Sequence, residues 1–291
     1  MNKIITRIIL VFIVSLVFCS EDEKYTFQYT FDYPEDGTEY IERWQHETEW
    51  SLDVPGIGYV KYASSYISLS QYLGQDGEFY KFKSTVIDME SNNSVDNIKL
   101  KDYYREAMED KPCYIYVKID GNGLIDYIEP VDPEHAYLQD AYEEAYMSLA
   151  PRNYRYPLGH LAQNISIGGS WTSSDDSLKF YLGFGSPPSR WWNKAVWNLK
   201  KVKDKSGIKI AYIDGIDKIR TEMNLIVDIF DERRVITGNA SGKRNVTLRW
   251  DVENTGVIFS RTGIQLQGDF EMDGETFSSK FYYRLIGRRV E

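Results

Sequence analysis

The stretch Ile219–Ile229, which reads IRTEMNLIVDI, decides the fold class. Every second position is apolar or a threonine, in the order Ile219, Thr221, Met223, Leu225, Val227 and Ile229. Because successive side chains of a β-strand point to opposite faces, a period of two predicts a strand with one buried face. The stretch therefore predicts β-structure in the middle of the C-terminal half.

Outward from this stretch the same kind of pattern continues. C-terminal strands are expected at 178–182, 195–199, 208–213, 246–252, 257–266 and 277–285, with turns at 254–256 and 273–274. Near the N-terminus, Tyr25–Tyr33 alternates aromatic and polar residues and is followed by a turn at Pro34–Gly37. This pattern predicts a long antiparallel hairpin with the strand that runs to Leu52, and further strands are expected at 59–73 and 79–89.

The strongest turn signal is Asp120-Gly121-Asn122-Gly123, which separates two short apolar runs. Asp-Gly and Asn-Gly pairs favour the tight turns of β-hairpins. An EF-hand calcium loop would need glycine at its sixth position, where this chain has Ile125. A hairpin is therefore predicted here, and no calcium site.

One helix is expected between the two β-rich parts, at 133–149. Asp132 is a suitable N-cap, Pro133 and Glu134 suit the first turn, and Pro151 ends the pattern. Its apolar residues recur at three- and four-residue spacing: Leu138, Tyr142, Ala145, Tyr146 and Leu149. A shorter helix is expected around 100–108. The predicted fold is mainly β, with antiparallel meanders that form two curved sheets or half-barrels around an apolar interior, with one central helix and one short helix.

The expected organisation has three parts. Residues 1–19 form a signal peptide, 20–151 an N-terminal β half that includes the helix, and 152–291 a C-terminal β half. Both halves contain a strand, an aspartate, a turn, a glycine and two apolar residues, at 119–125 and 250–258. This weak repeat is consistent with two related halves, although any hairpin with a glycine-containing turn produces a similar pattern.

The first residues have the layout of a secretory leader. Ile8–Phe18 is an unbroken apolar run behind Lys3 and Arg7, and it is too short to span a bilayer as a permanent helix. Cleavage after Cys19 would give a soluble exported protein, which is the preferred interpretation. The alternative is lipidation of Cys19; Leu16 fits a bacterial lipoprotein pattern, whereas bulky Phe18 stands where a small residue is usual. The expected location is the periplasm, the outer membrane or the extracellular space, with membrane attachment only through Cys19.

Composition limits the partners. The chain has 291 residues, 42% of them hydrophobic, and a net charge of -10. Removal of Lys3 and Arg7 with the leader brings the mature charge to -10 - 2 = -12. A net negative charge repels phosphate backbones, so nucleic acid is not expected as a partner. With Cys19 in the leader, Cys113 is the remaining cysteine, and it is expected to be a buried hydrophobic residue.

The segment Ile165–Trp171 (ISIGGSW), the Asp-Gly type hairpins and the two halves behind a leader resemble a family of uncharacterised bacterial exported proteins and lipoproteins. More distantly, this layout is similar to half-barrel periplasmic lipoproteins that carry lipids. The resemblance implies a β-rich envelope protein and a lipid as a partner. It supplies no catalytic residue.

Candidate catalytic and metal-binding residues are few. None of His46, His135 and His160 has metal-ligand spacing to another histidine or a cysteine, and His46 is expected at a solvated polar edge among Glu42, Glu47 and Glu49. Glu129, Asp132 and Glu134 are the densest acidic group, and helix capping accounts for two of them. No catalytic residue, metal or cofactor is therefore predicted, and an enzymatic role is not favoured.

Aromatic residues make up 15% of the chain and provide the candidate binding residues. Trp191 and Trp192 follow a proline-rich loop, and two adjacent residues of a strand must point to opposite faces. Together with Trp197 they are the candidate ligand-binding residues. The preferred function is non-catalytic binding of an apolar or amphipathic ligand; the alternative is a carbohydrate- or protein-binding surface module.

Overall fold

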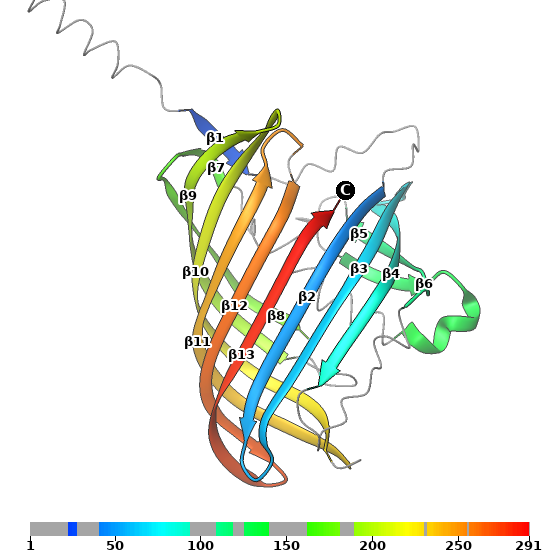
Figure 1. Cartoon of the computed structure of the whole chain (residues 1–291), viewed down its shortest axis with the longest axis vertical. Coiled ribbons are helices and arrows are strands. Elements are labelled where there is room, and N and C mark those ends of the chain that lie inside the picture. The colour runs from blue at the N-terminus through cyan, green and yellow to red at the C-terminus, as the bar shows by residue number, and fades with distance from the viewer. Residues whose placement is uncertain are drawn as a thin grey trace, which may run out of the picture.

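The structure is a computed structural model, and it describes residues 23–27, 41–93, 109–118, 125–139, 162–180, 189–229, 232–254 and 256–290. In these residues the chain forms long β-strands and one short 3₁₀ helix (Figure 1). The elements are β1 (Lys24–Phe27), β2 (Ile41–Val54), β3 (Gly58–Asp76), β4 (Phe79–Asn93), β5 (Cys113–Lys118), β6 (Ile125–Pro130), η1 (Pro133–Leu138), β7 (Ala162–Ser166), β8 (Ser170–Phe180), β9 (Ser189–Lys205), β10 (Ile208–Ile229), β11 (Glu232–Asp251), β12 (Gly256–Met272) and β13 (Glu275–Val290).

Eleven of the strands form one antiparallel sheet in the order β6-β5-β4-β3-β2-β13-β12-β11-β10-β9-β8. One meander runs from β2 to β6 and a second from β8 to β13, and the pairing of β13 with β2 joins them. The predicted mainly β class and the antiparallel meanders are therefore confirmed. The two meanders share this one curved sheet, where two sheets were expected, and β1 and β7 form a separate two-stranded sheet (Figure 1).

The predicted hairpin between Tyr25–Tyr33 and the strand that ends at Leu52 is wrong. In the structure β1 pairs with β7, and β2 lies between β3 and β13. Alternation in sequence shows that a segment is a strand but not which strand it pairs with. β7 and β13 are distant in sequence from the strands that they pair with, so nothing local to the expected hairpin could reveal them.

The deciding stretch is the C-terminal half of β10, and its predicted buried face is confirmed. Ile219, Thr221, Met223, Leu225 and Val227 are all buried. The strand is longer than expected, because 208–213 and the deciding stretch belong to one continuous strand of 22 residues. Between them the buried positions are occupied by a glycine and an aspartate, which interrupt the apolar pattern.

Glycines of the buried face, here called the inner face, make room for large rings. An added Cβ at Gly215 would lie 2.4 Å from the Trp197 ring, and one at Gly238 would lie 2.7 Å from the Phe270 ring. The sheet is curved (Figure 1), and the side chains of its inner face are closely packed. Glycine beside a large ring therefore permits both the curvature and close packing.

The predicted central helix at 133–149 is not borne out. Pro133–Leu138 forms the 3₁₀ helix η1, no α-helix is formed in the part of the chain that the structure describes, and 140–149 lie outside that part. The predicted cap is confirmed, since Asp132 accepts a hydrogen bond from the Glu134 amide at 3.0 Å. The burial of the predicted apolar stripe is not tested, because Tyr142, Ala145, Tyr146 and Leu149 lie outside the described residues. The shorter helix expected around 100–108 lies outside the described residues.

Turn chemistry was a better guide than helical spacing. Asp273 and Gly274 join β12 to β13 with positive φ angles of 55° and 84°, as a tight hairpin turn requires. β5 and β6 pair as the Asp120–Gly123 signal predicts, although the turn itself is outside the described residues. At the β11–β12 turn, buried Asp251 accepts hydrogen bonds from the Glu253 and Asn254 amides.

Replacing Gly215 by alanine tests the packing of the inner face. The added methyl group meets the Trp197 ring, so we expect a loss of about 1–3 kcal/mol in the free energy of unfolding, as for an overpacked core. Gly263→Ala is the matched control, because an added Cβ there has nothing within 4 Å and the backbone is extended. We expect it to change stability by at most about 1 kcal/mol, and to raise it. Urea unfolding of both variants gives the comparison; equal effects would contradict the packing role.

Candidate functional site

The inner face carries two apolar clusters, one towards each end of the strands. The first cluster consists of Trp50, Leu52, Val54, Val60, Tyr62, Trp191, Ile219, Met223, Leu225, Val227, Ile236, Ala240, Ile264, Leu266, Phe270, Phe281, Tyr283 and Leu285. The second consists of Tyr25, Phe27, Trp44, Ala195, Trp197, Leu199, Ala211, Ile213, Val246, Leu248, Trp250 and Val257, so it includes side chains of β1. Aromatic rings and aliphatic side chains thus extend over most of the length of the inner face.

The candidate tryptophans are distributed over both faces. Trp191 is 4% exposed in the first cluster, and Trp197 is fully buried in the second, where its Nε1 donates to the Ser173 hydroxyl at 2.8 Å. Trp192 is half-buried and points to the opposite face from Trp191, as adjacent strand residues must. The structure therefore does not bring the three residues together, and ligand contact by each of them stays a prediction.

A band of polar side chains, interrupted at β13 by Leu285 and Gly287, lies on the inner face between the two clusters. We call it the polar belt; by strand register it consists of Asn193, Asp217, Arg244, Thr262, Ser260, Thr48, His46 and Ser68. Most of these residues are buried. Sequence reasoning missed the belt because its members are spread over six strands and become neighbours only through the strand pairing.

The charged part of the polar belt is an ion pair between Asp217 and Arg244. The two residues are directly opposite on β10 and β11, and their side chains are 0% and 3% exposed. Asn193 Nδ2 lies 3.4 Å from Asp217 Oδ2. Asp217 Oδ1 and the Thr48 hydroxyl are buried and have no hydrogen-bond partner in the described part of the chain. Unsatisfied buried polar atoms are rare because each costs free energy, so these two atoms are candidate contacts for a ligand.

His46 belongs to the polar belt and not to a solvated edge, so the prediction for this residue is wrong. It is buried, its ring stacks on Tyr66 with a centroid distance of 4.6 Å, and it shares a hydrogen bond of 3.1 Å with the Ser68 hydroxyl. Burial lowers the pKa of His46 from 6.5 to about 4. Glu47 and Glu49 point to the other face, as predicted for a strand, and pair with basic residues there.

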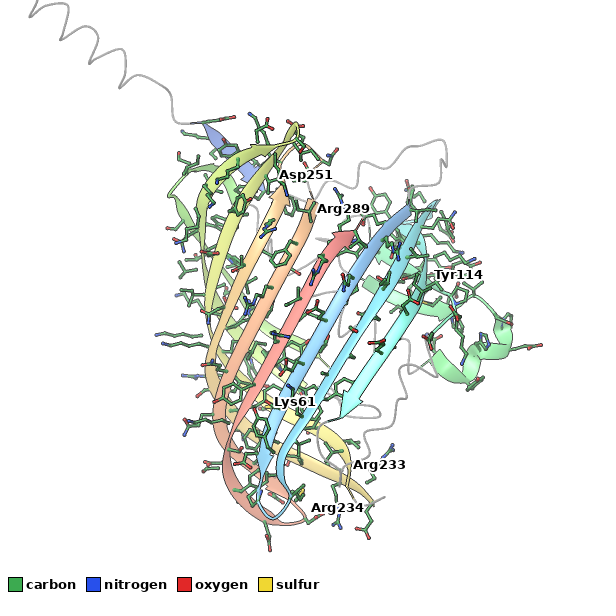
Figure 2. All side chains as sticks on the ribbon, in the orientation of Figure 1. Lys61, Tyr114, Arg233, Arg234, Asp251 and Arg289 are labelled. Carbon is green, nitrogen blue, oxygen red and sulfur yellow. The ribbon has the colours of Figure 1, made fainter. Side chains whose placement is uncertain are left out.

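The outer face carries a second aromatic group, at the lateral edge formed by β4, β5 and β6. This edge aromatic cluster consists of Phe79, Lys81, Tyr114, Tyr116 and Tyr127. Tyr116 and Tyr127 stack at 4.1 Å, and the Lys81 ammonium lies 4.1 Å from the centroid of Tyr114, which is labelled in Figure 2. Tyr127 is 38% exposed.

Burial raises the pKa of Tyr116, and the hydrogen bond that its hydroxyl donates to Glu129 at 2.5 Å raises it further. Glu129 is therefore a partner of the edge aromatic cluster, and Asp132 caps η1. These contacts give two members of the predicted acidic group a structural role.

Other sequence-based candidates are placed as follows. Cys113 is fully buried at the start of β5, as predicted. In the described residues, no group of three or more histidine, cysteine, aspartate and glutamate side chains could hold a metal ion. In the same residues, no helix has the length and apolar character to cross a membrane. Cys19, the leader and His160 lie outside the described residues.

No family model and no curated protein match the chain. Among solved structures, it is similar to lipovitellin, in a structure concerned with lipid–protein interactions, with 9% identity and a TM-score of 0.46 over 86% of this chain. The chain spans 25% of lipovitellin's length. It also matches the β domain of the Bordetella autotransporter BrkA (8% identity, TM-score 0.21) and the Vibrio cholerae outer-membrane protein OmpT (7%, 0.21), each over 99% of that chain and 86% and 87% of this one. These likenesses are too distant to transfer a function, and no family match supports the resemblance to exported lipoproteins.

The Asp217–Arg244 pair can be tested by a double-mutant cycle. Arg244→Met leaves the Asp217 carboxylate buried without its counter-ion, so we expect a loss of about 3–5 kcal/mol in the free energy of unfolding. The double variant Asp217→Leu/Arg244→Met removes both charges and should recover most of this loss. Urea denaturation measures all three proteins. A loss of less than about 1 kcal/mol for the single variant would mean that the pair is solvated.

His46 predicts a pH dependence of stability. The pKa of His46 is about 4 in the folded protein and 6.5 in the unfolded chain. Between these two pH values the unfolded chain binds a proton at His46 and the folded protein does not. Stability should therefore be fully present above about pH 6.5 and fall towards pH 4, by about 3 kcal/mol in total. Subtracting the urea-unfolding profile of His46→Gln from that of the unmodified protein isolates this step. His135→Gln, outside the sheet, should retain it; a flat difference profile would refute the role of His46.

Proposed function

We propose that this protein binds an apolar or amphipathic ligand against the inner face of its sheet, without catalysis, after export to the cell envelope. The observation that carries the proposal is the inner face itself, which is apolar on both sides of a polar belt that holds unpartnered polar atoms. The leader-like N-terminus supports the export part of the proposal.

The tryptophan side chains are unevenly distributed between the two faces of the sheet. All seven tryptophans lie in described strands, six of them on the inner face and Trp192 on the outer face. Large flat rings on the inner face of a curved sheet offer wide apolar contact at a low cost in side-chain entropy. Acyl chains or similar hydrocarbon groups match such a surface, because their transfer out of water is favourable in proportion to the area covered.

The polar belt adds the amphipathic component. Asp217 Oδ1 can accept a hydrogen bond, and the Thr48 hydroxyl can donate or accept one. Thr48 on β2 and Asp217 on β10 are four strands apart, so a ligand with one polar group along or at the end of an apolar body would satisfy one of these atoms while its apolar part contacts one of the clusters. A purely apolar ligand would leave both atoms unpartnered.

The edge aromatic cluster favours a second candidate function, a surface module for carbohydrate or protein. Tyr127 is exposed, and it belongs to a group of rings on the outer face beside the Lys81 ammonium. Sugars stack on such rings through their C–H groups, and peptides use the same surface. Loss of binding to a glycan or peptide in Tyr127→Ala, without any effect of inner-face variants, would favour this candidate.

Native mass spectrometry of protein from its own host is the first test of ligand binding, and a co-purified lipid mass is the expected result. Titration with a fatty acid and a phospholipid should then change tryptophan fluorescence, since six of the seven rings lie on the inner face. Trp192→Phe should keep this response. A protein without co-purified mass and without a fluorescence response to either lipid would refute the proposal.

Thr48→Val separates ligand contact from packing. It replaces an unpartnered buried hydroxyl by a methyl group of similar size, so the free protein should gain about 1 kcal/mol of stability. Affinity for the fatty acid should fall several-fold in the same variant. Thr237→Val on the exposed face is the matched control and should leave affinity unchanged. If Thr48→Val raised stability with unchanged affinity, the polar belt would not contact the ligand.

A further inference from the structure

The outer face of the sheet carries a row of three lysines on adjacent strands. Lys194 on β9 is directly opposite Lys218 on β10, and Lys218 is directly opposite Lys243 on β11. We call these residues the lysine row. Directly opposite side chains in an antiparallel pair have Cβ atoms about 5 Å apart, so the three ammonium groups share one small surface.

The lysine row has no counter-charge in the part of the chain that the structure describes. All three lysines are exposed, and none of them forms an ion pair there. Like charges directly opposite on a sheet are destabilising. The chain as a whole has a net charge of -10 with 44 acidic residues, yet in the described strands no acidic residue is directly opposite a member of this row. Such an arrangement is suited to an external anion.

The flanking residues of the lysine row are apolar on one side and cationic and aromatic on the other. Val196 and Ile216, opposite each other in the next pair, are 43% and 56% exposed. On the other side Trp192 is opposite Arg220. The surface formed by the lysine row and these four residues, here called the basic patch, has four cations and no carboxylate among its seven side chains.

We propose that the basic patch docks the protein on an anionic lipid bilayer. The four cations complement acidic headgroups, and the exposed side chains of Val196 and Ile216, with the half-buried ring of Trp192, suit the boundary between headgroups and acyl chains. A soluble polyanion would be held by the cations alone and would leave the exposed aliphatic side chains without a partner. The proposal does not depend on ligand binding, because the patch is on the outer face and the ligand is assigned to the inner face.

Vesicle co-sedimentation of the full chain tests this proposal. The unmodified protein should bind vesicles of phosphatidylglycerol mixed with phosphatidylcholine, and not vesicles of phosphatidylcholine alone. Binding should weaken as salt is added. In the triple variant Lys194→Gln/Lys218→Gln/Lys243→Gln, affinity should fall about fivefold for each lysine, on the order of a hundredfold in all.

The matched control is Lys203→Gln/Lys205→Gln/Lys280→Gln, which removes the same net charge from exposed positions outside the basic patch. It should retain most of the vesicle binding, and Ile216→Ser should weaken the binding that remains at high salt. Equal losses in the two triple variants would show that net charge alone matters and would overturn the proposal. It would also be overturned by no vesicle binding, or by binding of dextran sulfate without binding of vesicles.

Discussion

The pairing of β13 with β2 is the interaction on which the rest of the structure depends. It joins residues near the C-terminus to residues near position 50 and so turns two meanders into one sheet with one continuous inner face. Cross-strand ion pairs accompany it, among them Arg284 with Glu49 at 3.3 Å and Arg288 with Glu47. At the upper end of this junction in Figure 2, Arg289 lies 3.6 Å from Glu42 and 3.9 Å from Asp251.

These ion pairs support the register more than they add stability. Apart from the contact of Arg289 with buried Asp251, each pair is partly exposed, so solvent screens it and it contributes little free energy. A slip of one residue would place the Glu47 and Glu49 carboxylates on the inner face, away from their arginines and among apolar side chains. The pairs therefore penalise the wrong register strongly while stabilising the right one only modestly.

One sheet thus presents two surfaces of different chemistry. The inner face combines aromatic clusters with a polar belt, and the outer face combines charged residues with a few exposed apolar ones. A period-two sequence makes this possible, because neighbouring residues such as Trp191 and Trp192 serve opposite faces. The proposed ligand and the proposed bilayer therefore contact alternate residues of the same strands.

The predictions that held were local. Strand positions followed from alternation, the Asp273–Gly274 turn from its residue types, and the Asp132 cap from its position before a proline. His46 was misjudged because its neighbours in sequence are glutamates, whereas its neighbours in space are Tyr66 and Ser68 of the paired strand. The helix expected at 133–149 was not borne out in the described residues, where Pro133–Leu138 forms a 3₁₀ helix, and most of the apolar repeat lies outside them.

The sequence by itself determined that the protein is mainly β and antiparallel, because period-two alternation and glycine-containing turns depend on neighbouring residues only. Only the tertiary structure decided which strands pair and that the two meanders share a sheet. It also decided that Asp217 forms an ion pair with Arg244 and that three lysines lie on adjacent strands. The physical reason is that the register between strands is set by contacts among residues far apart in the chain. Those contacts cannot be deduced from any single segment of the sequence. Both candidate binding surfaces can therefore be recognised only from the pairing of the strands.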